Sequence, residues 1–213
     1  MIRIDIVSDA ICPWCYIGKR RLERALAAEA PGQIVVGWRP FQLNPDMPPE
    51  GMDRKAYLRR KFGSESGGPG YKNVLAAGLE EGIPFDFAAM RRTPNTIAAH
   101  RLIRRAEAEG RQDATVEALF QAYFTRGADI GDRATLADIA ASVGSDREAV
   151  VAYLAGDEGE SDVRAEDQFA RRVGIQGVPC FVVERKYAIS GAQPPEAFAE
   201  VFAQIRAEAA TNA

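Results

Sequence analysis

The 213-residue sequence has few of the residues from which metal and redox sites are usually built, with one histidine and three cysteines. A structural zinc site normally takes four such ligands, and here the spacings are far from the usual zinc patterns. The sequence also lacks an excess of positive charge, since its net charge is −3. We therefore expect no nucleic-acid partner and no attraction to an anionic membrane.

Two further features are missing. No apolar run approaches the length that spans a bilayer, so we expect no membrane partner. The first residues carry neither a basic segment nor the apolar stretch of a signal peptide, and an odd number of cysteines favours catalytic or buried thiols over a disulfide framework. The hydrophobic fraction of 46% is that of an ordinary globular protein. The sequence alone therefore predicts a cytoplasmic protein.

The most informative feature of the sequence is the stretch Cys12-Pro13-Trp14-Cys15, which lies between a predicted strand and a predicted helix. The alternating apolar run 2–7 before it is typical of a strand, and residues 17–28 after it are typical of a helix. The cysteines are thus predicted at a helix N-terminus, where free N–H groups and the helix dipole lower the pKa of a thiol. Cys12 can then attack a substrate, and Cys15, on the same helix face, can resolve the mixed disulfide.

Three other interpretations of the cysteine pair remain open. The pair could join Cys180 and His100 in a zinc site with three cysteines and one histidine. It could form a purely structural disulfide, although so short a loop constrains little chain entropy. The spacing could also be accidental, against which the flanking strand and helix argue.

The remaining pattern predicts an α/β protein. Residues 33–43 indicate a second strand, parallel to the first across a right-handed crossover. From about 53 to 157 the pattern is helical and nearly free of strand signals, with Thr93 and Ser145 as helix caps. A returning helix, a hairpin of two strands and a last helix follow in residues 161–173, 179–190 and 195–208. We predict a discontinuous domain of residues 1–45 and 160–213, with a large all-α insertion over residues 46–159.

Gly177-Val178-Pro179 opens the late strand, where a proline is tolerated because it need not donate a ladder hydrogen bond. Four segments together resemble the FrnE-like branch of the DsbA family over nearly the whole chain: Ser8–Gly18 with its CPWC motif, Pro94–Leu102, Gly177–Pro179 and Ser190–Gln193. The resemblance implies a thioredoxin-like fold with a helical insertion and dithiol–disulfide exchange without a metal or organic cofactor. It also implies a cis Val178–Pro179 bond that faces the cysteine pair. Cys180 departs from the family pattern, in which we expect an apolar residue or threonine.

Several side chains outside the cysteine pair have two interpretations each. Trp14 either stacks on a substrate or packs against the insertion. His100 either reaches the site, where it would assist a thiolate or contact a substrate, or is structural, which we favour. Asn95 either contacts a substrate or caps its helix. Asp9 either assists proton transfer or caps the first helix. Because strand residues alternate, Cys180 should point away from the pair as a buried, non-catalytic thiol.

The sequence thus predicts a thiol–disulfide oxidoreductase or isomerase. Its partners would be protein or low-molecular-weight thiols and disulfides, with glutathione among the candidates and a homodimer as a candidate assembly. One alternative is an enzyme like the kappa-class glutathione transferases or 2-hydroxychromene-2-carboxylate isomerase, which by resemblance use a serine-centred site. The cysteine pair argues against it. A zinc-bound or peptide-binding module is the other alternative.

Overall fold

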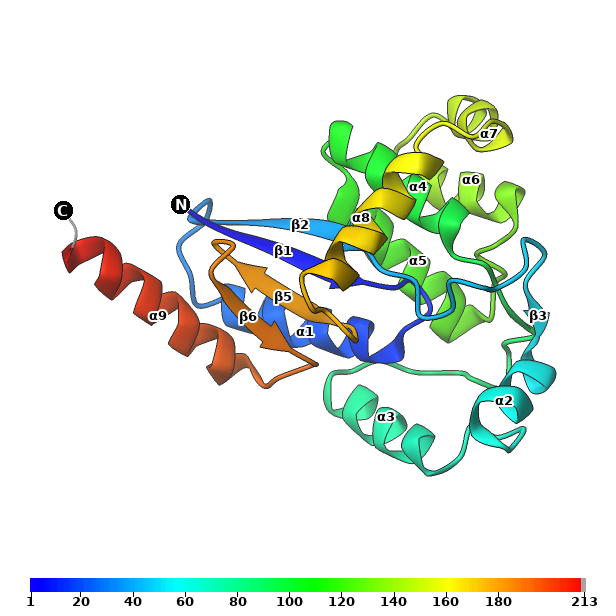
Figure 1. Cartoon of the computed structure of the whole chain (residues 1–213), viewed down its shortest axis with the longest axis horizontal. Helices are drawn as coiled ribbons and strands as arrows, with labels where there is room; N and C mark the ends of the chain where they lie inside the picture. Colours follow the sequence, from blue (N-terminus) through cyan, green and yellow to red (C-terminus); the bar gives the residue numbers. More distant parts are fainter. Residues whose placement is uncertain (212–213) are drawn as a thin grey trace.

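The computed structural model describes residues 1–211, without the side chain of Pro69. Its centre is a four-stranded sheet in the order β2-β1-β5-β6 (Figure 1). β1 (Ile2–Ser8) and β2 (Ile34–Pro40) run parallel and are joined by α1 (Pro13–Leu26), as the sequence predicts. β5 (Cys180–Val183) pairs antiparallel with β1, and β6 (Tyr187–Ser190) follows it as a hairpin.

The alternation in β1 gives the sheet two unlike faces. Ile4 and Ile6 belong to the large core cluster, which also holds Ile17 of α1. Val7 points the other way and packs in a small cluster that includes Ala170. The sheet is therefore covered by α1 on one face and by α8 (Glu160–Arg172) on the other (Figure 1).

The helices between β2 and β5 gather at one end of the molecule (Figure 1). They are α2 (Arg54–Phe62), α3 (Pro69–Glu80), α4 (Ile97–Ala108), α5 (Gln112–Arg126), α6 (Arg133–Ser142) and α7 (Arg147–Ala155), followed by α8. The last helix, α9 (Pro195–Thr211), lies against α1 and β6. This is the α/β fold with a helical insertion that the sequence predicts, while the boundaries at residues 45 and 160 stay a prediction. No helix within residues 1–211 is both long and apolar enough to cross a bilayer.

The helical part contains one short antiparallel pair of strands that no sequence pattern predicts. β3 (Met52–Asp53) pairs antiparallel with β4 (Arg92–Thr93). Thr93 is fully buried there and accepts a hydrogen bond from the Arg54 guanidinium at 2.9 Å. It therefore does not cap α4, which begins only at Ile97.

The predicted cap of α7 was wrong by one residue. The Asp146 carboxylate accepts a hydrogen bond from the backbone N–H of Ala149, which makes Asp146 the N-cap. Ser145 instead donates its hydroxyl hydrogen bond to Glu109 at 2.6 Å. A tertiary contact thus decided between two neighbouring residues that are both good caps.

Candidate active site

Cys12 and Cys15 lie at the predicted corner between β1 and α1. Cys12 is the N-cap of α1 with an extended backbone, and Pro13 occupies the first helical turn, where no N–H needs a partner. The Cys15 N–H donates to the Cys12 carbonyl at 3.0 Å. No side chain caps α1, so Cys12 lies next to the free N–H groups and the positive end of the helix dipole.

The late proline loop forms the opposite wall of the corner. The Val178–Pro179 peptide bond is cis, as predicted. The Cys12 thiol donates a hydrogen bond to the Val178 carbonyl at 3.5 Å, which brings the loop onto the cysteine pair. A Cβ on Gly18 would lie 3.0 Å from both Pro179 and Phe181, so α1 approaches this loop too closely for a side chain. The close approach at Gly18 is not predictable from the sequence, because nothing in a helical pattern marks it.

Both thiols of the pair are buried in this structure, which holds them unbonded. Burial raises the pKa of the Cys15 thiol well above its ordinary value, and its hydrogen bond to Cys12 raises this pKa further. The Ser8 hydroxyl and the Asp9 N–H act in the opposite direction. Cys15 is thus held as a thiol beside Cys12.

Cys12 is less accessible than expected for an attacking residue, with 4% of its surface exposed. The turn is therefore not open around Cys12 itself. Pro13 and Trp14 are its half-buried members, and Trp14 packs on the main core cluster while keeping part of its ring at the surface. Packing thus accounts for part of the Trp14 side chain, and stacking on a substrate stays a prediction.

Asp9 joins His100 to the dithiol corner. The buried Asp9 carboxylate accepts hydrogen bonds from the N–H groups of Leu43 at 2.7 Å and Ile11 at 3.5 Å, so it does not cap α1 as considered. Its Oδ1 lies 3.4 Å from Nε2 of His100, which projects from α4 and is also buried. His100 therefore approaches the site through Asp9, an arrangement that neither interpretation of His100 had anticipated.

Asn95 is engaged at both ends of its amide. Its oxygen accepts from the Ile97 N–H at 3.0 Å, and its Nδ2 donates to the Met47 carbonyl at 2.7 Å. These bonds favour the interpretation in which Asn95 organises the start of α4 over a substrate contact.

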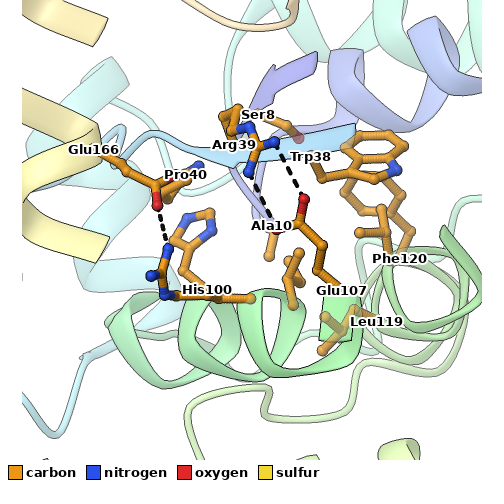
Figure 2. A pocket seen from close by; sticks show the side chains of 13 residues that line it. Ser8, Ala10, Trp38, Arg39, Pro40, His100, Glu107, Leu119, Phe120 and Glu166 are labelled. Atoms are coloured by element: carbon orange, nitrogen blue, oxygen red, sulfur yellow. Dashed lines mark hydrogen bonds and ion pairs between the residues drawn. The ribbon is translucent and has the colours of Figure 1, made fainter. Parts of the chain in front are cut away.

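One hollow reaches the corner at Ser8 and Ala10, and a second, which neither cysteine lines, begins at Leu43. A small cavity of about 10 Å³ is lined by the end of β1, by β2 and by α4, and ion pairs of Arg39 with Glu107 and of Arg104 with Glu166 frame it (Figure 2). A wider pocket of about 310 Å³ begins at Leu43 and reaches Lys61 of α2. It is the roomier of the two spaces for a small ligand.

Cys180 lies apart from the pair. It is buried in the cluster of Val7, Phe41 and Ala170 on the α8 face, as strand alternation predicts. Burial alone raises the pKa of its thiol. Within residues 1–211, no three His, Cys, Asp or Glu side chains are grouped so that they could hold a metal ion. The ligand set of the zinc alternative is therefore not assembled.

Comparison with known sequences agrees with this geometry. The family model described as a DSBA-like thioredoxin domain matches residues 3–203. YwbO of Bacillus subtilis (strain 168), an uncharacterized protein, is 25% identical over 145 residues, which is 68% of each protein.

Solved structures extend the comparison. A probable DsbA oxidoreductase from Streptomyces coelicolor is 34% identical with a TM-score of 0.88, over 98% of this chain and 91% of its own. The cytosolic disulfide reductase DsbM from Pseudomonas aeruginosa, solved with GSH, has a TM-score of 0.71 at 18% identity, over 96% and 99% of the two chains. A 2-hydroxychromene-2-carboxylate isomerase reaches 0.77 at 15% identity, over 99% of both. At such low identity, the last two share the fold.

Proposed function

The chain belongs to the DSBA-like thioredoxin domain family, and from this premise we propose that it is a thiol–disulfide oxidoreductase acting through Cys12 and Cys15. One observation carries the proposal. Cys12 stands at an uncapped helix N-terminus, with Cys15 buried behind it and the Val178 carbonyl in front of it. This asymmetry suits one sulfur for attack and the other for resolution.

The reaction starts when the Cys12 thiolate attacks a substrate disulfide. A bond forms between Cys12 Sγ and one substrate sulfur, and the other substrate sulfur leaves as a thiolate. Cys15 then loses its proton and attacks Cys12 Sγ, which forms the Cys12–Cys15 disulfide and releases the second substrate thiolate. Two electrons pass from the protein dithiol to the substrate, and the reverse sequence oxidises a substrate dithiol.

The surroundings of the two sulfurs set this order. A helix N-terminus favours negative charge beside it, and Cys12 occupies that position, whereas burial holds the pKa of Cys15 high. Cys15 therefore remains a thiol while Cys12 attacks. Electrons move between sulfurs throughout, so the proposal includes no metal or organic cofactor.

The substrates in this proposal are protein or low-molecular-weight disulfides in the cytoplasm, with glutathione among them. The fold shared with a cytosolic reductase solved with GSH supports this choice. The pocket that begins at Leu43 offers space for a small thiol beside the loop that Asp9 holds. Pro13, Trp14, Val178 and Pro179 shape the site around the two sulfurs.

A glutathione-dependent isomerase is the second candidate, because a 2-hydroxychromene-2-carboxylate isomerase shares the fold over 99% of both chains. Against it, this chain has Cys12 and Cys15 where that class, by resemblance, centres on serine. Isomerisation of a 2-hydroxychromene-2-carboxylate that requires glutathione and survives in Cys15→Ser would favour this candidate.

The deciding experiment is to trap the intermediate. In Cys15→Ser, Cys12 can attack but no internal thiol can release the product, so a substrate should remain disulfide-linked to Cys12. Non-reducing electrophoresis and mass spectrometry of the variant after contact with a cell extract would identify it. The matched control is the double variant Cys12→Ser, Cys15→Ser, which should trap nothing. Equal trapping by both proteins would refute the proposal.

A further inference from the structure

Three buried polar residues lie behind the cysteine pair, and the exchange described above does not use their side chains: Ser8, Asp9 and His100. The Ser8 hydroxyl acts on Cys15 by lowering the pKa of that thiol. Ser8 and His100 also line the same small cavity, and His100 rises from α4 toward the strand ends (Figure 2). The cavity therefore connects Ser8, which tunes the Cys15 thiol, with the single histidine of the chain.

The His100 ring also has a buried nitrogen without a hydrogen-bond partner among the described residues. It is 4% exposed, and within residues 1–211 its Nε2 makes no hydrogen bond of good geometry, although Asp9 Oδ1 lies 3.4 Å away. Buried polar atoms are almost always paired, so an unpaired ring nitrogen in a native structure calls for an explanation such as a catalytic role or an ordered water.

We propose that Ser8, His100 and Asp9 form a proton path for Cys15, in which His100 holds the proton. The inference rests on the proposed function, because the path serves the step in which Cys15 resolves the mixed disulfide. The cavity volume of about 10 Å³ is close to the minimum that holds one water molecule. A water there would join Ser8 Oγ to His100. Ser8 is the member of the path whose side chain acts on a reacting sulfur, so His100 and Asp9 are positioning residues that act through it.

The proton and the electrons balance along this path. As Cys15 attacks, its proton passes through Ser8 Oγ and the water to His100, which becomes an imidazolium beside the Asp9 carboxylate. The Cys15–Cys12 bond forms, the bond between Cys12 and the substrate sulfur breaks, and the substrate leaves with that electron pair. In the reverse direction, Cys15 leaves as a thiolate and takes the proton back.

The other charged groups around His100 are already paired with one another. Arg39 of β2 lies 3.2 Å from Glu107 of α4, and Arg104 of α4 pairs with Glu166 of α8. Asp9, from the segment between β1 and α1, places its carboxylate Oδ1 3.4 Å from Nε2 of the ring. The opposite charges within each ion pair offset one another, so Asp9 is left to stabilise a protonated His100.

Rapid mixing with dithiobis(nitrobenzoate), an aromatic disulfide with a coloured thiolate, separates the two steps. The reduced protein should release one coloured thiolate in a bimolecular phase, when Cys12 attacks, and a second in a first-order phase, when Cys15 resolves. We expect Ser8→Ala and His100→Gln to slow the second phase at least about tenfold near pH 7, because a positioned proton acceptor is lost. The first phase should change by less than about twofold.

A structural role and a proton path predict different pH profiles. If the proton path operates, the second phase of both variants should approach the wild-type rate as the pH rises, since hydroxide then removes the Cys15 proton directly. Ser8→Thr keeps the hydroxyl and should restore the second phase. Thr115→Val removes a buried hydroxyl outside the path and should change neither phase.

The outcomes separate this inference from the proposed function. If the second phase keeps its rate and pH profile in both Ser8→Ala and His100→Gln, the proton path is wrong, while exchange at the cysteine pair stands. If wild-type protein shows no first phase at all, the proposed function fails and the path fails with it. If Ser8→Thr is as slow as Ser8→Ala, the hydroxyl is not the carrier and the inference is overturned.

Discussion

Cys15 and Cys180 are buried to similar degrees, 1% and 5% exposed, on opposite faces of one sheet. On the α1 face, Cys15 has a second sulfur, a hydroxyl and a backbone N–H beside it. On the α8 face, Cys180 has Val7, Phe41 and Ala170 as neighbours. Burial raises the pKa of both thiols. The proposed distinction between Cys15 as a redox thiol and Cys180 as an inert one therefore rests on polar neighbours, because burial does not distinguish the two.

The strongest test of this contrast is to remove each kind of cysteine in turn. Cys12→Ala should lower disulfide reductase turnover at least about a thousandfold, because the attacking sulfur is gone. Cys180→Ala should retain activity within about twofold, since its thiol faces the other side of the sheet. Reduction of insulin disulfides, followed by turbidity, measures both. A large loss in Cys180→Ala, or a disulfide from Cys180 to either member of the pair, would remove the distinction between the faces.

Gly18→Ala tests how closely α1 must approach the proline loop. The new methyl group would meet Pro179 and Phe181 at 3.0 Å, so we expect a loss of about 1–3 kcal/mol in the free energy of unfolding. Urea denaturation measures it. The matched control is Gly70→Ala on α3, where no atom lies within 4 Å of the added methyl group. That variant should be neutral or up to about 1 kcal/mol more stable, because alanine favours a helix. Equal losses in both would show that the close approach is unimportant.

The apolar cluster around Cys180 can be tested by changing the polarity of residue 180. Cys180→Ser places a hydroxyl among apolar side chains and should lower the free energy of unfolding by about 1–2 kcal/mol. Cys180→Ala leaves a small cavity and should cost about 1 kcal/mol or less. Chemical denaturation at neutral pH shows which of the two variants has the larger free energy of unfolding. Were serine the better tolerated residue, this face would hold a polar partner for residue 180.

The smallest expected effect concerns stability in alkali. Because burial raises the pKa of Cys180, the native state holds this proton more tightly than the unfolded chain does. The corresponding stabilisation is complete below the unfolded thiol pKa near 9.0 and is lost as the pH rises through the higher native pKa. Cys180→Val, which cannot ionise, should therefore lose less stability than wild type above that pH. Unfolding curves at neutral and alkaline pH measure the difference, and parallel decline of the two proteins would contradict it.

The features predictable from sequence rest on local patterns. Alternation in residues 2–7 set the two faces of β1, and the CPWC stretch between a strand and a helix located the dithiol corner. The same alternation, applied after Pro179, placed Cys180 on the far face. In each case the signal lies within a few residues of the feature it specifies.

The features that escaped prediction depend on distant contacts. The β3–β4 ladder is two residues long and leaves no periodicity to detect. The carboxylate of Asp9 finds its partner N–H on Leu43, 34 residues later, and its histidine on α4. The burial of Cys12 depends on a loop 166 residues away. No local pattern encodes such contacts, because each depends on how separate elements pack.

That long separation has a consequence for synthesis of the protein. Cys12 leaves the ribosome early, whereas Val178, whose carbonyl receives its thiol, follows 166 residues later. At about 5–20 residues per second, the nascent dithiol waits roughly 10–30 s for the wall of its own site. During that interval neither β5 nor the proline loop exists to cover the pair, so the growing chain presents two thiols to every oxidant around it. Completion of translation is thus the step that encloses the site, and a chain that stalls before the last two strands carries an unguarded dithiol.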